Sequence, residues 1–233
     1  MNKELFKKEL SKINININDK QLEQLEQYYE ILVTENNKYN LTSITNKEDV
    51  YLKHFYDSAT LSTTINLTNQ SLCDIGTGAG FPGMVLKILF PELKVTLVDA
   101  TLKKCNFLEL VIKELELTDI EVINQRAEEF AKETREKYDI VTSRAVAPLK
   151  HLLEYSIPLV KVNGTYIAMK SYITKEIDGI SNYEEKLSIK KENLITFNLP
   201  IENSLRTLIS YKKLKVTNPI YPRKYSEIKK KSL

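Results

Sequence analysis

The segment Cys73-Asp74-Ile75-Gly76-Thr77-Gly78-Ala79-Gly80-Phe81-Pro82-Gly83 (CDIGTGAGFPG) holds four of the six glycines in a chain of 233 residues. Glycines let backbone N–H groups approach a ligand without a Cβ clash, and they permit positive φ. A short apolar run, SLCDI, leads into the segment, and residues 83–90 have the pattern of a helix. The segment is therefore predicted to be a ligand-binding turn between a strand and a helix.

Beyond this turn, strand-like and helix-like segments alternate. Strands are predicted at 71–75, 94–100, 119–125, 138–144 and 165–171, with helices at 83–90, 102–117, from 127, and near 149–159. This alternation is typical of parallel βαβ units with helices on both faces of the sheet. A helix beyond Lys175 and strand-like runs at 192–200 and 205–215 predict a closing hairpin. The expected fold class is α/β, with a Rossmann-like sheet.

The first 65 or so residues have helical patterns instead. Asp19 is predicted to cap one helix and Asn46 to begin another. From Tyr211 to the end, the chain carries eight Lys or Arg residues against one Glu, which suits either a solubilising tail or a polyanion-binding edge. We expect an N-terminal helical extension at 1–65 packed on the core, a core at 66–215, and a basic C-terminal tail at 216–233.

Two cofactors fit the glycine-rich turn. Gly78 to Gly83 spell G-x-G-x-x-G, the dinucleotide pattern, whereas Asp74 to Gly80 spell D-x-G-x-G-x-G, which favours S-adenosylmethionine. Asp99, at the end of the second predicted strand, can bind ribose hydroxyls in either cofactor. Asp74 would repel a pyrophosphate but can orient a cationic methionine end, directly or through water. Ala127 and Glu128, after the third strand, can read an adenine edge.

A nicotinamide enzyme has one further point in its favour. Tyr166 and Lys170 have the Tyr-x-x-x-Lys spacing of short-chain dehydrogenases. That pair requires a helix, and the surrounding NGTYIAMKS is predicted to be a strand after a turn. The spacing therefore does not support a dehydrogenase, and S-adenosylmethionine is the cofactor that we expect.

Composition excludes several classes of protein. The start, MNKELFKKELSKI, has no apolar h-region, so no secretory signal is predicted. No segment approaches the roughly 18 apolar residues that a membrane helix needs. Cys73 and Cys105 have neither metal-ligand spacing nor a disulfide framework, so no metal site is indicated and a cytoplasmic location is expected. We expect a monomer.

Motifs along nearly the whole chain resemble the ribosomal small-subunit methyltransferase G family, formerly called glucose-inhibited division protein B. The glycine segment alone indicates only a class I methyltransferase. Its continuation Phe81-Pro82-Gly83 is more specific, as are the segments around it. The resemblance rests on KYNLTS (38–43), HFYDS (54–58), DIGTGAGFPG (74–83), TLVDATLKK (96–104), QRAEEF (125–130), SRAVAPL (143–149), AMKS (168–171) and YPRK (221–224).

The resemblance implies S-adenosylmethionine-dependent methylation of guanine N7 in 16S rRNA, at guanine 527 in the usual rRNA numbering. The implied partner is 16S rRNA in the small ribosomal subunit or an assembly intermediate, and no membrane. One departure is Glu35, where the family usually carries tryptophan. Carried over by motif, the expected cofactor contacts are Gly76, Phe81, Asp99, Ala127, Glu128 and Arg144. The glycine pattern adds Asp74, Gly78 and Gly80. The expected guanine-positioning or RNA-binding residues are Asn40, His54, Arg126, Arg144, Lys170, Arg223 and Lys224.

The chemistry of guanine N7 agrees with what the chain lacks. This nitrogen has an in-plane lone pair and no proton to lose, so methylation needs positioning rather than a general acid or base. No Pro-Cys pair offers a thiolate, and the fourth strand ends in SRAVAPL rather than in an amine-binding Asn/Asp-Pro-Pro motif. Arg144 would donate to guanine O6, a phosphate or the cofactor carboxylate. Two alternatives stay open: a class I methyltransferase for another RNA, a protein or a small molecule, and an inactive ribosome-binding relative.

Overall fold

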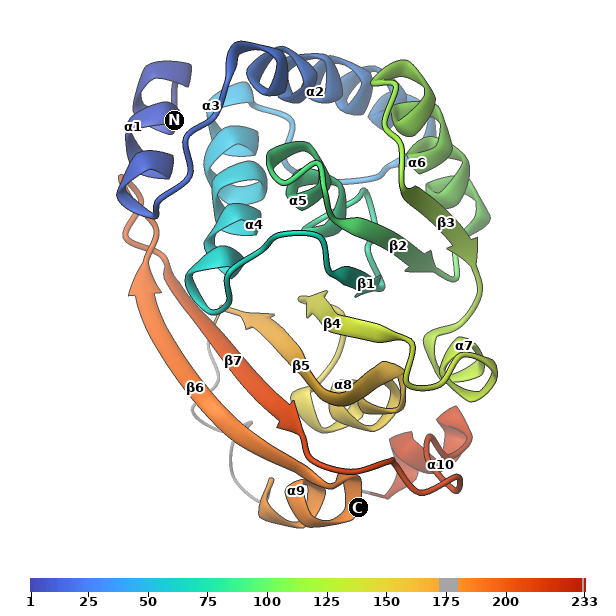
Figure 1. Ribbon diagram of the computed structural model, residues 1–233. Coiled ribbons are helices and arrows are strands. Elements are labelled where there is room, and N and C mark those ends of the chain that lie inside the picture. Colours follow the sequence, from blue (N-terminus) through green and yellow to red (C-terminus); the bar gives the residue numbers. More distant parts are fainter. Residues whose placement is uncertain (172–179, 232) are drawn as a thin grey trace.

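A seven-stranded mixed sheet runs through the computed structural model, which describes residues 1–171, 180–231 and 233. The strand order is β3-β2-β1-β4-β5-β7-β6 (Figure 1). The strands are β1 (Ser71–Ile75), β2 (Lys94–Asp99), β3 (Ile120–Asn124), β4 (Tyr138–Arg144), β5 (Val160–Lys170), β6 (Ile189–Asn198) and β7 (Leu205–Lys213).

The first five strands are parallel and confirm the predicted βαβ units. The chain passes from β1 outward to β3, then crosses back and continues on the other side of β1 through β4 and β5. The strand order therefore reverses between β1 and β4, and ligands of open α/β sheets bind at the carboxyl ends of the strands at such a point. The turn after β1 lies at this point.

The predicted closing hairpin is present: β7 pairs antiparallel with both β5 and β6. The predicted helix near 149–159 ends earlier, because α8 (Leu149–Ser156) passes through a 3-10 turn, η3 (Ile157–Leu159), into β5. Strand β5 therefore begins at Val160 and runs through Asn163, which has φ 65°. Tyr166 and Lys170 both lie in this strand, so they do not form the helical pair of a short-chain dehydrogenase.

Helices cover both faces of the sheet (Figure 1). One face packs against α5 (Gly83–Leu89), α6 (Leu102–Glu114) and the N-terminal helices, around a core that includes Leu97, Phe107 and Ile140. The other face packs against α7 (Ala127–Glu133), α8 and α9 (Ser181–Leu187), around Val141 and Tyr166. Adjacent residues of each strand thus serve opposite cores, as the strand period of two requires.

The N-terminal segment comprises α1 (Lys3–Lys12), α2 (Asp19–Tyr39), α3 (Lys47–Val50), the π-helical η1 (Tyr51–Tyr56), α4 (Asp57–Ala59) and the 3-10 turn η2 (Thr60–Thr63). The cap of α2 is Asn18 rather than the predicted Asp19, because Asn18 Oδ1 accepts from Gln21 N while Gln21 Oε1 accepts from Asn18 N. Asn46 caps α3 as predicted. These helices share one core with α5 and α6.

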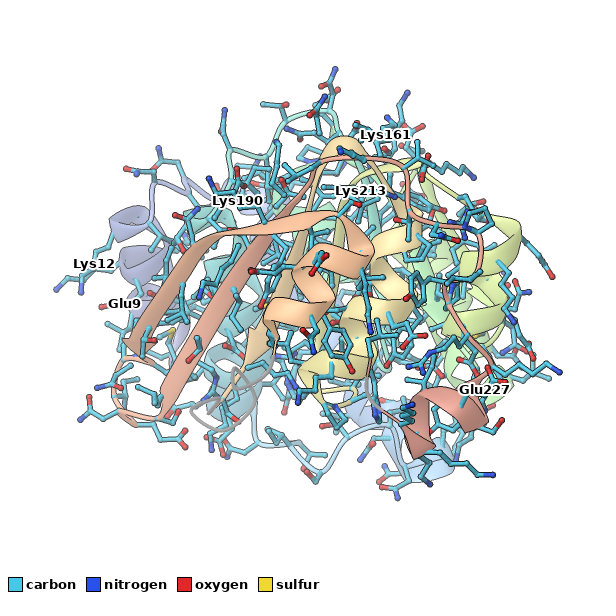
Figure 2. The ribbon with its side chains drawn as sticks, turned by 90° about the horizontal axis from the view of Figure 1, so that it is seen from below. Glu9, Lys12, Lys161, Lys190, Lys213 and Glu227 are labelled. Carbon is cyan, nitrogen blue, oxygen red and sulfur yellow. The ribbon has the colours of Figure 1, made fainter. Side chains whose placement is uncertain are left out.

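The C-terminal end of the chain forms a last short helix, α10 (Tyr225–Lys230), which packs on α8. Figure 2 shows α10, marked by Glu227, at the opposite end of the molecule from α1, marked by Glu9 and Lys12. The division into parts at residues 65 and 215 remains a prediction. Within the described ranges, no helix is both long enough and apolar enough to cross a membrane.

Candidate cofactor and substrate site

Two adjoining cavities open at the carboxyl ends of the parallel strands. The η1 cavity, of about 370 Å3, lies between these ends, helix η1 and the start of β7. The α7 cavity, of about 420 Å3, lies between the ends of β1 and β2 and the start of α7. Gly76, Arg144 and Ala145 line both cavities, so the cavities meet where the glycine loop faces the end of β4.

The glycines of the loop differ in what they face. Gly76 and Gly78 line the cavities, and a Cβ on Gly78 would meet no atom closer than 4.0 Å. Gly78 also has φ 62°, a conformation that favours glycine. Gly80 faces the interior, where an added Cβ would lie 2.5 Å from the hydroxyl of Tyr28. Gly78 thus leaves space beside the backbone for a ligand, whereas the space beside Gly76 is occupied by Val146 and the space beside Gly80 by the buried Tyr28.

Tyr28 ties helix α2 to the loop. Its hydroxyl donates a hydrogen bond to the carbonyl oxygen of Ala79, and its side chain is fully buried. Its ring centroid lies 5.6 Å from those of Phe55 and Phe81 and 6.4 Å from that of Phe107. An aromatic cluster from the N-terminal helices, the loop and α6 therefore holds the loop in place.

Asp74 is engaged within the loop. Its Oδ2 accepts from Thr77 Oγ1 at 2.7 Å and from Gly83 N at 2.8 Å, while its Oδ1 has no hydrogen-bond partner among the described residues. Burial raises the pKa of this carboxyl to about 6. Asp74 lines neither cavity, so its main contacts join the two ends of the glycine loop.

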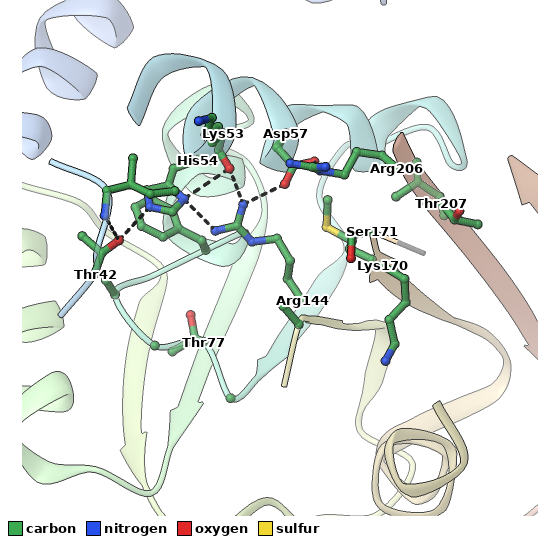
Figure 3. A pocket seen from close by; sticks show the side chains of 18 of the residues that line it. Thr42, Lys53, His54, Asp57, Thr77, Arg144, Lys170, Ser171, Arg206 and Thr207 are labelled. Atoms are coloured by element: carbon green, nitrogen blue, oxygen red, sulfur yellow. Dashed lines mark hydrogen bonds and ion pairs between the residues drawn. The ribbon is translucent and has the colours of Figure 1, made fainter. Parts of the chain in front are cut away.

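Arg144 ends β4 and points into the η1 cavity (Figure 3). Its Nη1 donates to the carbonyl oxygen of Lys53 at 2.9 Å and to Asp57 Oδ2 at 3.0 Å, and its Nη2 lies 3.1 Å from His54 Nδ1. The guanidinium carbon lies 5.1 Å from the ring centroid of Phe81. Four partners therefore fix the orientation of one guanidinium.

His54 is neutral in this setting. Its Nδ1 lies 3.1 Å from Arg144 Nη2 and 3.2 Å from the carbonyl oxygen of Lys53, and its Nε2 lies 3.0 Å from Thr42 Oγ1. In the tautomer that accepts from Arg144 at Nδ1, Nε2 carries the proton and donates to Thr42. Burial and the charge of Arg144 lower the pKa of the imidazole to about 3. Its ring stacks on Phe81 with centroids 4.3 Å apart. Both nitrogens are occupied, which suits a positioning role and not a general base.

Asp57 was not assigned a role from the sequence, although it belongs to the HFYDS motif. Its carboxylate is 5% exposed and bridges two arginines: Oδ2 accepts from Arg144 and Oδ1 accepts from Arg206 Nε at 3.0 Å. Arg206 is the second residue of β7 and also lines the η1 cavity. The HFYDS motif, which contains both His54 and Asp57, is a sequence signal for these two residues. Nothing local in the sequence points to Arg206.

Asp99 ends β2 and lines the α7 cavity, as predicted from its position. Its Oδ2 accepts from Gly78 N at 3.0 Å, and its Oδ1 accepts from Thr101 N at 2.8 Å. Lys104 Nζ lies 3.8 Å from Oδ2. A carboxylate offers about four lone-pair sites. Each oxygen therefore retains capacity to accept from a hydroxyl in the cavity.

The start of α7 forms the opposite wall of the α7 cavity. Ala127 and Glu128 line it, and Glu128 Oε1 accepts from Arg126 Nε at 2.6 Å. The Arg126 guanidinium carbon lies 4.8 Å from the ring centroid of Tyr225, on α10. Tyr225 and the buried Tyr155 complete this wall. Arg126 thus contacts both Glu128 of α7 and the ring of Tyr225 in α10.

Lys170 and Asn40 occupy different positions relative to the η1 cavity. Lys170 ends β5, lines the cavity and donates from Nζ to the carbonyl oxygen of Ala147 at 2.6 Å. Asn40 is exposed and ends α2 in a left-handed conformation with φ 50°. It does not line the cavity, whereas the next residues, Leu41 and Thr42, do.

Arg223 and Lys224 of the basic tail differ in exposure. Arg223 donates from Nε and Nη2 to the two carboxylate oxygens of Glu154, both at 2.7 Å, and Glu154 is fully buried. Lys224, directly before α10, is exposed. An RNA contact by Arg223 would compete with this ion pair. Glu35, where the resembling family has tryptophan, is paired with Lys38 at 2.7 Å.

Sequence comparisons identify relatives over nearly the full length. The family model described as rRNA small subunit methyltransferase G (GidB) matches residues 21–205. The chain is 48% identical over 228 residues to the ribosomal RNA small subunit methyltransferase G of Bacillus cytotoxicus, covering 96% of this chain and 95% of that protein. It is 45% identical to the protein of the same name from Mycoplasma capricolum, covering 94% of each. These matches confirm the resemblance seen in the motifs.

Solved structures share the fold at low sequence identity. A SAM-dependent methyltransferase from Aquifex aeolicus superposes with a TM-score of 0.54 at 14% identity, covering 77% of this chain and 97% of that one. TYW2 of M. jannaschii, solved in complex with AdoMet, has a TM-score of 0.54 at 15% identity over 64% of this chain and 72% of that one. The Rossmann-like α/β fold class predicted from the sequence is confirmed.

Proposed function

Because the chain belongs to the rRNA small subunit methyltransferase G family, we propose that it transfers a methyl group from S-adenosylmethionine to N7 of a guanine in 16S rRNA. The target proposed by family resemblance is the guanine at position 527. The observation that carries this proposal is the meeting of two cavities at Arg144, one lined by the carboxylate of Asp99 and the other by basic side chains.

The α7 cavity suits the adenosine half of the cofactor. Asp99 has lone pairs left for the ribose diol, and Ala127 and Glu128 lie across the cavity from it. The open space beside Gly78 suits the close approach of a ligand to the backbone. S-adenosylmethionine supplies an electrophilic methyl group on a sulfonium sulfur. The methionine end would lie near Gly76 and Arg144, where the two cavities meet.

The η1 cavity suits the guanine. Arg144, Lys170 and Arg206 are donors on its walls, and donors of this kind bind guanine O6 or phosphate oxygens. Phe81, whose ring stacks on the imidazole of His54, forms an apolar part of the cavity wall. Since guanine N7 has no proton to lose, the neutral His54 and its saturated hydrogen bonds do not impede the reaction. The protein contributes positioning, which can supply several kcal/mol of the barrier by itself.

Basic residues near the cavities support an RNA partner. Lys170 and Arg206 lie on the walls of the η1 cavity, and the exposed Lys224 directly precedes Tyr225, which lines the α7 cavity. A target base must leave its stack to enter a cavity of this kind. We propose that the enzyme acts in the cytoplasm on the small subunit or an assembly intermediate, as a monomer, and that its RNA affinity falls steeply with salt.

The proposal is tested by mapping N7-methylguanine in 16S rRNA. Cells lacking this chain, cells with it, and cells with Asp99→Ala are compared by borohydride and aniline cleavage, which cuts RNA at N7-methylguanine. A cleavage site present only with the unaltered chain is expected. An identical pattern in all three cells contradicts the proposal. Transfer of labelled methyl to another RNA or a protein would favour a different substrate, and ribosome binding without transfer would favour an inactive relative.

A further inference from the structure

The basic C-terminal segment is anchored to the fold at several points. Arg135 donates to the carbonyl oxygens of Thr217 and Tyr221, both at 2.7 Å, and Arg223 makes its paired contacts with the buried Glu154 of α8. Ile228 of α10 is 2% exposed. These contacts make residues 217–230 an ordered part of the fold and set the position of helix α10.

The anchored segment brings one aromatic ring to the α7 cavity. Tyr225 is the first residue of α10 and lines the cavity beside Arg126, Ala127 and Glu128. Its ring faces the guanidinium group of Arg126, whose central carbon lies 4.8 Å from the ring centroid. The Nε of Arg126 donates to Glu128 Oε1. The residue is 42% exposed, so part of its ring is open to a ligand.

We propose that Tyr225 is a cofactor-binding residue, and that the C-terminal segment forms the outer wall of the adenosine site. This inference rests on the proposed use of S-adenosylmethionine and deepens it. An adenine in the α7 cavity has Asp99 at its ribose side and Glu128 near its edge, and the ring of Tyr225 offers a surface for its face. Aromatic rings bind bases through their π-faces. Residues 217–230, whose charge suggested RNA binding, would thereby contribute to binding of the cofactor.

The ion pair of Arg223 with Glu154 has a clear part in this arrangement. Arg223 lies two residues before Tyr225, so its ion pair with Glu154 fixes the position at which α10 begins. Arg126 contributes from the other side, because its guanidinium is held by Glu128 and faces the ring. Arg126 is thus a positioning residue for Tyr225 in this proposal, in addition to any contact with RNA.

A single-tryptophan reporter tests the contact directly. The chain contains no tryptophan, so Tyr225→Trp introduces one fluorophore at the proposed site. Titration of the RNA-free protein with S-adenosylhomocysteine is expected to quench its emission at saturation, with a midpoint equal to the calorimetric Kd. Tyr29→Trp, on α2 and outside both cavities, is the matched control and should not respond. Equal responses from the two reporters, or none from either, would overturn the proposal.

Affinity measurements separate the cofactor from RNA. Tyr225→Ala should raise the Kd for S-adenosylmethionine by roughly fivefold to a hundredfold, the range expected for a lost base–ring stack. Tyr225→Phe and Ser226→Ala, on the same exposed turn, should stay within about twofold, because neither loses the ring. Thermal unfolding of each variant checks the fold. Weakened RNA binding with an unchanged cofactor Kd for Tyr225→Ala would assign the ring to RNA and refute the proposal.

These readouts are independent of the rRNA assay. A cofactor response without N7-methylguanine in 16S rRNA would retain Tyr225 in the site and reject the proposed substrate. An rRNA product together with an unchanged cofactor Kd in Tyr225→Ala would support the proposed substrate and remove Tyr225 from the cofactor site.

Discussion

The carboxylate of Asp57 lies 3.0 Å from Nη1 of Arg144, the residue that ends β4 between the two cavities. The two residues are separated by 87 positions in the chain, and they join the N-terminal helices to the sheet. Arg206 approaches the other oxygen of Asp57. One carboxylate therefore sets the orientation of two cationic side chains on the wall of the η1 cavity.

Asp57→Asn should slow methyl transfer at saturating cofactor. The amide keeps the shape but loses the charge that two guanidinium groups share, so a loss of stability of about 3 kcal/mol is expected. A rate loss of at least about tenfold, or about 1.4 kcal/mol of transition-state stabilisation, should accompany it. Single-turnover rates and urea unfolding measure the two effects. Asp49→Asn, an exposed partner of Lys53, should change neither.

A double-mutant cycle identifies how Asp57 acts. If its part is to hold Arg144, then Asp57→Asn combined with Arg144→Ala should be little slower than Arg144→Ala alone. Additive losses would instead give Asp57 a role of its own. Arg144→Ala by itself should reduce transfer far more than it reduces stability, and a rate equal to that of the unaltered enzyme would remove Arg144 from the site.

Asp99→Ala should weaken binding of S-adenosylmethionine while leaving RNA affinity largely intact. Hydrogen bonds to a charged group contribute about 1.5–3 kcal/mol each, so loss of the ribose contacts should raise the Kd tenfold or more. Asp99→Asn retains one acceptor and should give an intermediate Kd. Calorimetry on the protein alone provides the measurement. An unaltered Kd in Asp99→Ala would refute the assignment of Asp99 to the ribose.

Tyr28→Phe removes only the hydroxyl that donates to the carbonyl oxygen of Ala79. Because that hydroxyl is buried, the free energy of unfolding should fall by about 1–3 kcal/mol. The cofactor Kd should rise as well, since the loop loses its tie to α2. The control is the neighbouring Tyr29→Phe, whose hydroxyl makes a 3.3 Å contact with Thr45 at the surface and should have little effect. Equal stability of the two variants would contradict this role of Tyr28.

The raised pKa of Asp74 predicts a pH dependence of stability. Burial raises its pKa from 3.8 to about 6, so the folded protein binds this proton more tightly than the unfolded chain does. The stabilisation from protonation is fully present below about pH 3.8 and is lost as the pH rises through about 6. Relative to Asp74→Asn, the unaltered protein should lose on the order of 2 kcal/mol of unfolding free energy between about pH 4.5 and 7.

His54 has the opposite dependence, which makes the comparison with a variant necessary. Its pKa is lowered to about 3, so its contribution to stability is present above about pH 6.5 and is lost as the pH falls toward 3. Since His54 is present in both proteins, its contribution largely cancels in the difference between them. Urea unfolding across this pH range measures that difference, and a difference independent of pH would contradict the predicted titration of Asp74.

The strands, and the edge of the sheet at which the cavities open, could be predicted from the sequence because their signals are local. Alternating apolar runs locate β1 to β5, and Asp99 is recognisable from its place at the end of a strand. The contacts of Asp57 with Arg206 and of Arg223 with Glu154 could not be predicted. These pairs are separated by 149 and 69 positions, and their meeting depends on how the hairpin and α8 pack. A basic tail has the same composition whether its charges face RNA or a buried glutamate.

The buried hydroxyl of Tyr28 has a consequence for how this protein can be divided or varied. The Rossmann-like core contains the whole glycine loop, yet the side chain that supports the loop from behind comes from a helix more than forty residues earlier in the chain. A fragment beginning at β1 would keep every cofactor motif but expose Phe81 and Phe107 and release Arg144 from Asp57. The N-terminal helices therefore support both the glycine loop and Arg144, and changes in α2 should alter cofactor binding without any direct contact with the cofactor.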